Sequence, residues 1–65
     1  MLISLGGKDT EVKDEITLQE LVKSRGLPGR VLVELNGSLV KTEQWNQTRL
    51  KSGDVIEMIQ VVVGG

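Results

Sequence analysis

The sequence contains no histidine, no cysteine, no phenylalanine and no tyrosine. Without histidine and cysteine, the chain has no imidazole general base, no thiol nucleophile and no His/Cys zinc site. A disulfide is also excluded, so the fold must be held by side-chain packing. These absences remove much of the usual catalytic chemistry, and we expect neither a catalytic residue nor a metal site in this chain.

Basic and aromatic side chains are too few and too scattered for a nucleic-acid surface. The formal net charge is −1, the eight basic residues are spread from Lys8 to Lys51, and Trp45 is the only aromatic residue. A nucleic-acid-binding domain normally shows a basic patch or a set of stacking rings. No apolar run approaches the roughly 20 residues of a membrane helix, and residues 1–3 do not begin a signal peptide. We therefore expect a cytoplasmic protein that binds neither nucleic acid nor membrane.

The first part of the chain predicts two strands followed by a helix. Residues 1–5 have the pattern of a short strand, and the glycine pair at 6–7 predicts a hairpin to a polar edge strand over 8–13. The Thr-Leu-Gln-Glu segment at 17–20 has the spacing of a capping box, which satisfies free backbone N–H groups at the start of a helix. Gly26 suits the left-handed conformation that ends one.

The second part predicts three more strands. Strands are expected over residues 30–35 and 38–40, joined by a type I′ turn at Asn36-Gly37. Residues 41–48 read as an irregular connection with one helical turn. The last strand, 55–63, is apolar on both faces, which is typical of a strand that is central or covered.

This order of elements predicts an α+β fold. A helix between strands usually crosses one face of the sheet with a right-handed connection. The simplest arrangement is a mixed sheet of four to five strands with one main helix packed on one face and with the first and last strands as neighbours. We assign residues 1–63 to this single domain and residues 64–65 to a flexible C-terminal tail.

The two glycines after the last strand suggest a use for the C-terminus. Glycine is a poor strand residue, yet Gly64 and Gly65 directly follow the most apolar strand. Two residues without a Cβ make a thin tip, and residues 62–65 can span about 13 Å at about 3.3 Å per residue. Such a tip can enter a narrow active site of a partner and present its carboxylate there. The alternative is a tail without a role.

Five segments spread along the chain form an ordered set. They are Ile16-Thr17-Leu18-Gln19-Glu20-Leu21, Val33-Glu34-Leu35-Asn36-Gly37, Glu43-Gln44-Trp45, Leu50-Lys51-Ser52-Gly53-Asp54-Val55-Ile56-Glu57-Met58 and Gly64-Gly65. No single segment is diagnostic, but the ordered set in so short a chain is specific. With these segments the chain resembles, along its whole length, the ThiS family of sulfur carriers in thiamine biosynthesis.

The resemblance implies a ubiquitin-like β-grasp fold and a carrier that is not itself an enzyme. It implies that an E1-like adenylyltransferase uses ATP and magnesium to convert the carboxylate of Gly65 into an acyl-adenylate. A sulfur donor, a cysteine desulfurase or a rhodanese-like protein, then produces a thiocarboxylate, and thiazole synthase takes the sulfur. Gly65 is thus the implied carrier site and Gly64 its spacer, and no cofactor is bound permanently.

Strand alternation predicts a surface for docking these partners on the face of the sheet away from the helix. A contiguous exposed apolar patch usually marks an interaction surface, although ordinary residual surface apolarity is the alternative. The residues that we assign to this surface are Leu2, Leu32, Glu34, Glu57, Ile59 and Val61, and we also count Val62 and Val63 among the docking residues.

Three other functions fit a small domain that ends in two glycines. The small subunit of molybdopterin synthase shares the fold and the thiocarboxylate, but its members are usually longer, and Glu43-Gln44-Trp45 favours the thiamine carrier. A ubiquitin-like modifier would join the same activated Gly65 to lysines. A plain β-grasp interaction domain would leave the tail idle.

Overall fold

In this computed structural model the structure is described for residues 1–61. The expected tail residues Gly64 and Gly65, and the expected docking residues Val62 and Val63, lie outside the described residues. The elements in chain order are β1 (Leu2–Leu5), β2 (Lys8–Glu11), α1 (Leu18–Arg25), β3 (Arg30–Leu35), β4 (Ser38–Val40), the 3₁₀ helix η1 (Thr42–Gln47) and β5 (Val55–Val61).

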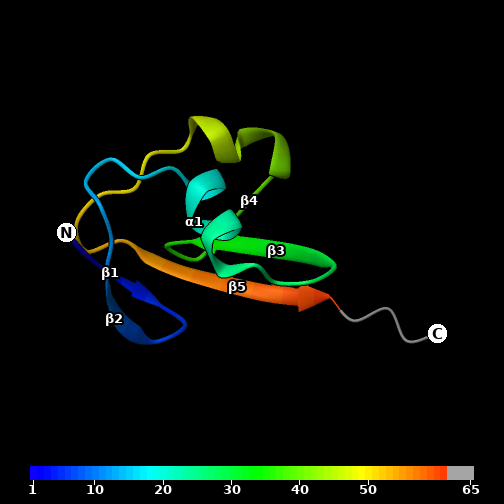
Figure 1. Ribbon diagram of the computed structural model, residues 1–65, viewed down its shortest axis with the longest axis horizontal. Coiled ribbons are helices and arrows are strands. Elements are labelled where there is room, and N and C mark those ends of the chain that lie inside the picture. The colour runs from blue at the N-terminus through cyan, green and yellow to red at the C-terminus, as the bar shows by residue number, and fades with distance from the viewer. Residues whose placement is uncertain (62–65) are drawn as a thin grey trace.

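The strands form one mixed sheet of five strands in the order β2-β1-β5-β3-β4. The pair β1 and β5 is parallel, whereas β1–β2, β3–β5 and β3–β4 are antiparallel. Helix α1 crosses the sheet over β3 and β5, and η1 lies beyond it (Figure 1). The predicted mixed sheet with one main helix, and with the first and last strands as neighbours, is confirmed.

Local chemistry sets both ends of α1, as the sequence predicts. The backbone N–H of Glu20 donates to Thr17 Oγ1, and the N–H of Thr17 donates to Glu20 Oε1, each at 3.1 Å. This reciprocal pair is a capping box. At the other end Gly26 has φ 59° and ψ 31°, and its N–H donates to the carbonyl of Lys23. Glycine is favourable in this left-handed conformation because it has no Cβ that would clash with the backbone.

Glu20 should make a pH-dependent contribution to stability. Lys13 Nζ lies 2.7 Å from Glu20 Oε2, and this bond, followed by that from the Thr17 backbone, lowers the pKa of Glu20 from 4.5 to about 2. Because the folded pKa lies below the unfolded one, the ionised carboxylate stabilises the fold fully above pH 4.5, and this stabilisation is lost as the pH falls through about 2.

The variant Glu20→Gln should therefore lose stability at neutral pH and approach the wild type in acid. Urea unfolding at neutral pH and at several pH values below 4.5 would measure the difference in free energy between the two proteins. For comparison, Thr17→Ala is expected to cost about 1 kcal/mol through the same cap. A difference between Glu20→Gln and wild type that does not shrink in acid would contradict this assignment.

The core lies between α1, η1 and the sheet. Ile16, which precedes the helix cap, and Leu21 inside the helix both belong to it, as does Trp45 of η1. The indole N–H of Trp45 donates to the carbonyl of Val40 at 3.0 Å, so the tryptophan anchors the connection to β4. The buried core residues are Ile3, Ile16, Leu18, Leu21, Val31, Val33, Trp45, Leu50 and Ile56.

Two segments differ from the predictions in the extent of their regular structure. Strand β2 ends at Glu11 instead of residue 13. Val12 still exchanges hydrogen bonds with Met1, but a turn at residues 14–15, with Glu15 left-handed at φ 61°, then leads the chain to α1. Residues 41–48 contain a full 3₁₀ helix where a single turn was expected. The predicted type I′ turn is confirmed, since Asn36 and Gly37 both have positive φ, at 51° and 86°.

Candidate protein-docking site

The face of the sheet opposite α1 carries the described docking candidates side by side. Residues directly opposite in an antiparallel pair share a face. The β3–β5 register pairs Leu32 with Ile59 and Glu34 with Glu57. It also places Val61 on this face, opposite Arg30. The structure therefore brings together the residues that strand alternation assigns to one surface.

This surface extends across the neighbouring strands. On β1, Leu2 is 51% exposed while the adjacent Ile3 is buried. On β4, Leu39 lies opposite Glu34 and is 60% exposed. Val55, at the start of β5, is also exposed and precedes the buried Ile56. We call this surface the outer face; its residues are Leu2, Leu32, Glu34, Leu39, Val55, Glu57, Ile59 and Val61.

Leu39 and Val55 are members of the outer face that the sequence analysis missed. A two-residue loop at Asn36-Gly37 fixes the hairpin register, so it places Leu39 opposite Glu34. In the same way, alternation back from Glu57 reaches Val55. The sequence therefore contains the signals for both residues: the two-residue loop for Leu39, and for Val55 the same strand alternation that places Ile59 and Val61.

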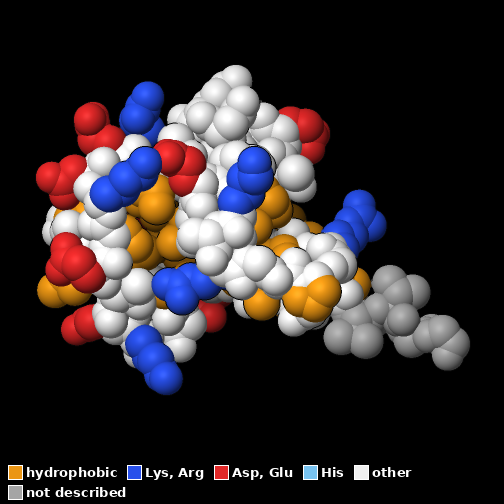
Figure 2. Space-filling model, in the orientation of Figure 1, with side chains coloured by type: hydrophobic (Ala, Val, Ile, Leu, Met, Phe, Trp, Pro, Cys, Tyr) orange, Lys and Arg blue, Asp and Glu red, His pale blue; other side chains and the backbone are white. Residues whose placement is uncertain are grey.

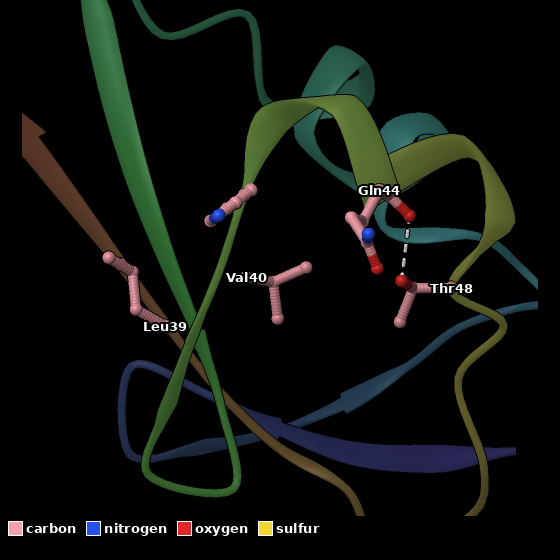
Figure 3. Close-up of a pocket in the computed structure, with 5 residues that line it drawn as sticks. Leu39, Val40, Gln44 and Thr48 are labelled. Carbon is pink, nitrogen blue, oxygen red and sulfur yellow. Dashed lines mark hydrogen bonds between the residues drawn. The ribbon is translucent and has the colours of Figure 1, made fainter.

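A hollow lies beside β4 at the edge of the sheet. Its volume is about 390 Å³, and it is lined by Leu39, Val40, Lys41, Gln44 and Thr48. Val40 points toward Gln44 and Thr48, whereas Leu39 projects on the other side of the strand (Figure 3). Thr48 Oγ1 donates to the carbonyl of Gln44 at 2.7 Å. Among the described residues that line the hollow, Lys41 is the only titratable one, so they offer no acid–base pair.

Carboxylates outnumber cations among the outward positions of the strands. Besides Glu34 and Glu57, the β1–β2 register places Asp9 and Glu11 on this side, and Arg30 is the basic outward residue of β3. The N-terminal ammonium lies 2.6 Å from Glu11 Oε2, and this hydrogen bond raises the pKa of the ammonium. Around α1, in contrast to the outward positions of the strands, basic and acidic side chains are interspersed (Figure 2).

The described residues supply no other candidate centre. Within residues 1–61 no group of three His, Cys, Asp or Glu side chains is placed to hold a metal ion. Over the same residues, no helix has the length and apolar character required to cross a membrane. The outer face is therefore the feature of the described structure that best suits an interaction.

Strand β5 is the central strand of the sheet and leads toward the C-terminal residues. It remains paired with β3 up to Val61. Gln60 Nε2 also donates to the carbonyl of Pro28 at 2.9 Å, which ties the end of β5 to the loop after α1. The outer face is thus continuous with the strand that immediately precedes residues 62–65.

Comparison with known proteins gives matches along almost the entire chain. The model of the ThiS family matches residues 3–65. The sulfur carrier protein ThiS of Bacillus subtilis (strain 168) is 36% identical over 66 residues, which cover 98% of this chain and 100% of that protein.

Solved structures agree with the fold. The crystal structure of the thiamine biosynthesis protein (ThiS) from Geobacter metallireducens superimposes with a TM-score of 0.86 and 29% identity, covering 100% of both chains. The solution structure of a thiamine biosynthesis protein from the same organism gives a TM-score of 0.81 and 29% identity, covering 100% of this chain and 88% of that one.

Proposed function

The chain belongs to the ThiS family, and from this premise we propose how it carries sulfur. Its family and relatives make it a sulfur carrier of thiamine biosynthesis with the ubiquitin-like β-grasp fold. We propose that residues 1–63 are the domain, that residues 64–65 are the tail, and that the sulfur is held as a thiocarboxylate on Gly65. The observation that carries this proposal is that the family match extends to Gly65.

The proposed chemistry begins with activation of a carboxylate, which is a poor acyl donor. The Gly65 carboxylate attacks the α-phosphorus of ATP, pyrophosphate leaves, and an acyl-adenylate forms. The terminal sulfur of a donor persulfide then attacks the acyl carbon, and AMP departs with the former carboxylate oxygen. A thiol next attacks the donor sulfur of the resulting acyl disulfide, which releases the thiocarboxylate and leaves a disulfide on the donor side. The final thiocarboxylate is more nucleophilic than the original carboxylate and can pass its sulfur to the thiazole ring.

Partner enzymes supply every catalytic group in this scheme, and the carrier acts as their co-substrate. The chain has no histidine or cysteine, which accords with a carrier that is not an enzyme. We assign activation, with its ATP and magnesium, to an E1-like adenylyltransferase. Sulfur would come from a cysteine desulfurase or rhodanese-like protein and pass to thiazole synthase. A reducing cytoplasm suits these thiol-dependent steps.

We assign docking of the adenylyltransferase and of thiazole synthase to the outer face. Its exposed apolar side chains lie on one face of four neighbouring strands, and exposed apolar surface of this kind usually marks an interaction site. Docking there would hold the partner beside the end of β5, and residues 62–65 would be the part of the chain nearest to its active site. Gly64, which has no side chain, would then allow Gly65 to approach the reacting group.

The variant Ile59→Asp should retain the fold and weaken adenylation. Ile59 is 45% exposed, so an aspartate there can remain hydrated in the free protein, whereas docking would bury its charge without a partner. The rate of pyrophosphate release with the adenylyltransferase should fall by about tenfold or more, since a buried unpaired charge costs at least 1.4 kcal/mol. The matched control is Leu27→Asp, which adds the same charge at an exposed leucine in the loop after α1. Equal kinetics for the two variants would contradict docking on the outer face.

The molybdopterin synthase subunit and the ubiquitin-like modifier remain distinguishable by experiment. A pull-down with this chain should recover thiazole synthase and leave the large subunit of molybdopterin synthase behind. Incubation with the adenylyltransferase and a sulfur donor should give a mass gain of one oxygen-to-sulfur exchange on the carrier, with no conjugates to lysines of other proteins.

A further inference from the structure

Two carboxylates of the outer face lie directly opposite each other. Glu34 of β3 and Glu57 of β5 are register partners, so their Cβ atoms are about 4.5–5.5 Å apart. Like charges in this position destabilise a sheet. A pair of this kind in the central strands suggests a role that compensates for its cost to folding.

The described part of the chain provides no cation for this pair. Within residues 1–61 the ion pairs join the N-terminal ammonium to Glu11 and Asp14, and Lys13 to Glu20. The outward basic residue of β3, Arg30, lies four positions from Glu34 along the strand, which is about 13 Å. In the free protein the two carboxylates are therefore solvated by water.

Exposed apolar side chains border the acidic pair. Leu32 and Ile59 lie next on one side along β3 and β5, Val55 lies on the other, and Leu39 is opposite Glu34 on β4. A protein that covers these side chains also removes water from Glu34 and Glu57. Such burial is unfavourable unless the partner brings a cation.

We propose that Glu34 and Glu57 together receive one arginine side chain of the protein that docks on the outer face. This inference rests on the proposed docking function and adds the chemistry of recognition. A guanidinium has five N–H donors in a planar fork and is more weakly hydrated than an ammonium, so it can bridge two carboxylates. A second copy of this chain is a poor occupant, because a two-fold pairing of outer faces would bring together two such acidic pairs.

The test compares Glu34→Gln/Glu57→Gln with the wild type in binding to the adenylyltransferase of the same organism. The double variant should bind about 30-fold more weakly or worse, as expected when one side of a buried charge pair is neutralised. Its affinity should also depend less on added sodium chloride. At the same time its melting temperature should rise by about 2–6 °C, because the repulsion is removed. Weaker binding by a more stable protein is a result that a purely structural role would not give.

Control variants separate the possible failures. Glu15→Gln removes one charge from the loop before α1 and should bind like the wild type. If Ile59→Asp loses binding but the acidic double variant does not, the outer face docks the partner and the arginine proposal is wrong. If neither variant changes the affinity, the outer face is not the docking site and both proposals fail. If the double variant binds weakly but melts below the wild type, altered folding accounts for the loss and the recognition role is overturned.

Discussion

One alanine added after Gly65 is expected to abolish sulfur loading. The extension moves the terminal carboxylate by about 3.3 Å and places a methyl group where the proposed tip has none. Displacements of about 1 Å in a reacting group can already lower a rate by about 100-fold. Intact mass measured after incubation with the adenylyltransferase, ATP, magnesium and a sulfur donor should show no exchange of oxygen for sulfur.

The control for this extension is its removal. An added segment that a protease cleaves directly after Gly65 should block loading before cleavage and restore it afterwards. Gly64→Val is expected to reduce loading as well, because its side chain hinders approach through a narrow channel, while binding to the partner through the outer face continues. An extended carrier that delivers sulfur at the normal rate would refute the assignment of Gly65 as the carrier site.

Leu18→Ala is expected to have the largest effect on stability. Leu18 is fully buried in the core at the first position of α1, and its backbone N–H donates to the carbonyl of Thr48 at 2.9 Å. Truncation of a buried leucine costs about 2–5 kcal/mol, whereas the whole stability of a small domain is about 5 kcal/mol. A measurable fraction of the variant should therefore be unfolded without denaturant.

Urea unfolding followed by circular dichroism measures this loss. The matched control is Leu39→Ala, which removes the same atoms from a side chain that is 60% exposed, and it should change stability by about 0.5 kcal/mol or less. If both variants unfold at the same urea concentration, Leu18 does not occupy the core position that the structure gives it.

The sequence predicts best where neighbouring residues determine the structure. Thr17 and Glu20 specify the start of α1 through contacts three residues apart, and Gly26 specifies its end. The turn at Asn36-Gly37 is similarly local, since both residues must adopt positive φ. These features need no knowledge of the remainder of the chain, and the structure confirms each of them.

Features that depend on distant segments are less predictable. The bridge between Thr17 and Arg49, and the bond from Arg49 Nη1 to the carbonyl of Glu15, join residues that no local pattern connects. The left-handed conformation of Glu15 accompanies these contacts and has no signal of its own. Likewise, Glu34 lies opposite Glu57 because of the register between β3 and β5, which no local pattern in the sequence determines.

The candidate site, too, is predictable from the sequence only where local patterns determine it. Alternation within single strands was sufficient to place Leu32, Ile59 and Val61 on one face, because side chains in a strand alternate with a period of two. The breadth of that face depends on which strands are neighbours, which is a property of the sheet. The roles of Gly64 and Gly65 are inferred from chemistry and family, and they remain predictions.

The position of β5 also governs when the protein can fold during its synthesis. It is the last strand in sequence but the middle strand of the sheet, so the β1–β2 and β3–β4 hairpins have no common neighbour until residues 55–61 leave the ribosome. Pairing across such sequence distances is the slow part of folding. A nascent chain therefore cannot assemble the outer face, which we propose as the docking surface, until residues 55–61 have been translated, and products truncated before them would not present this surface to a partner.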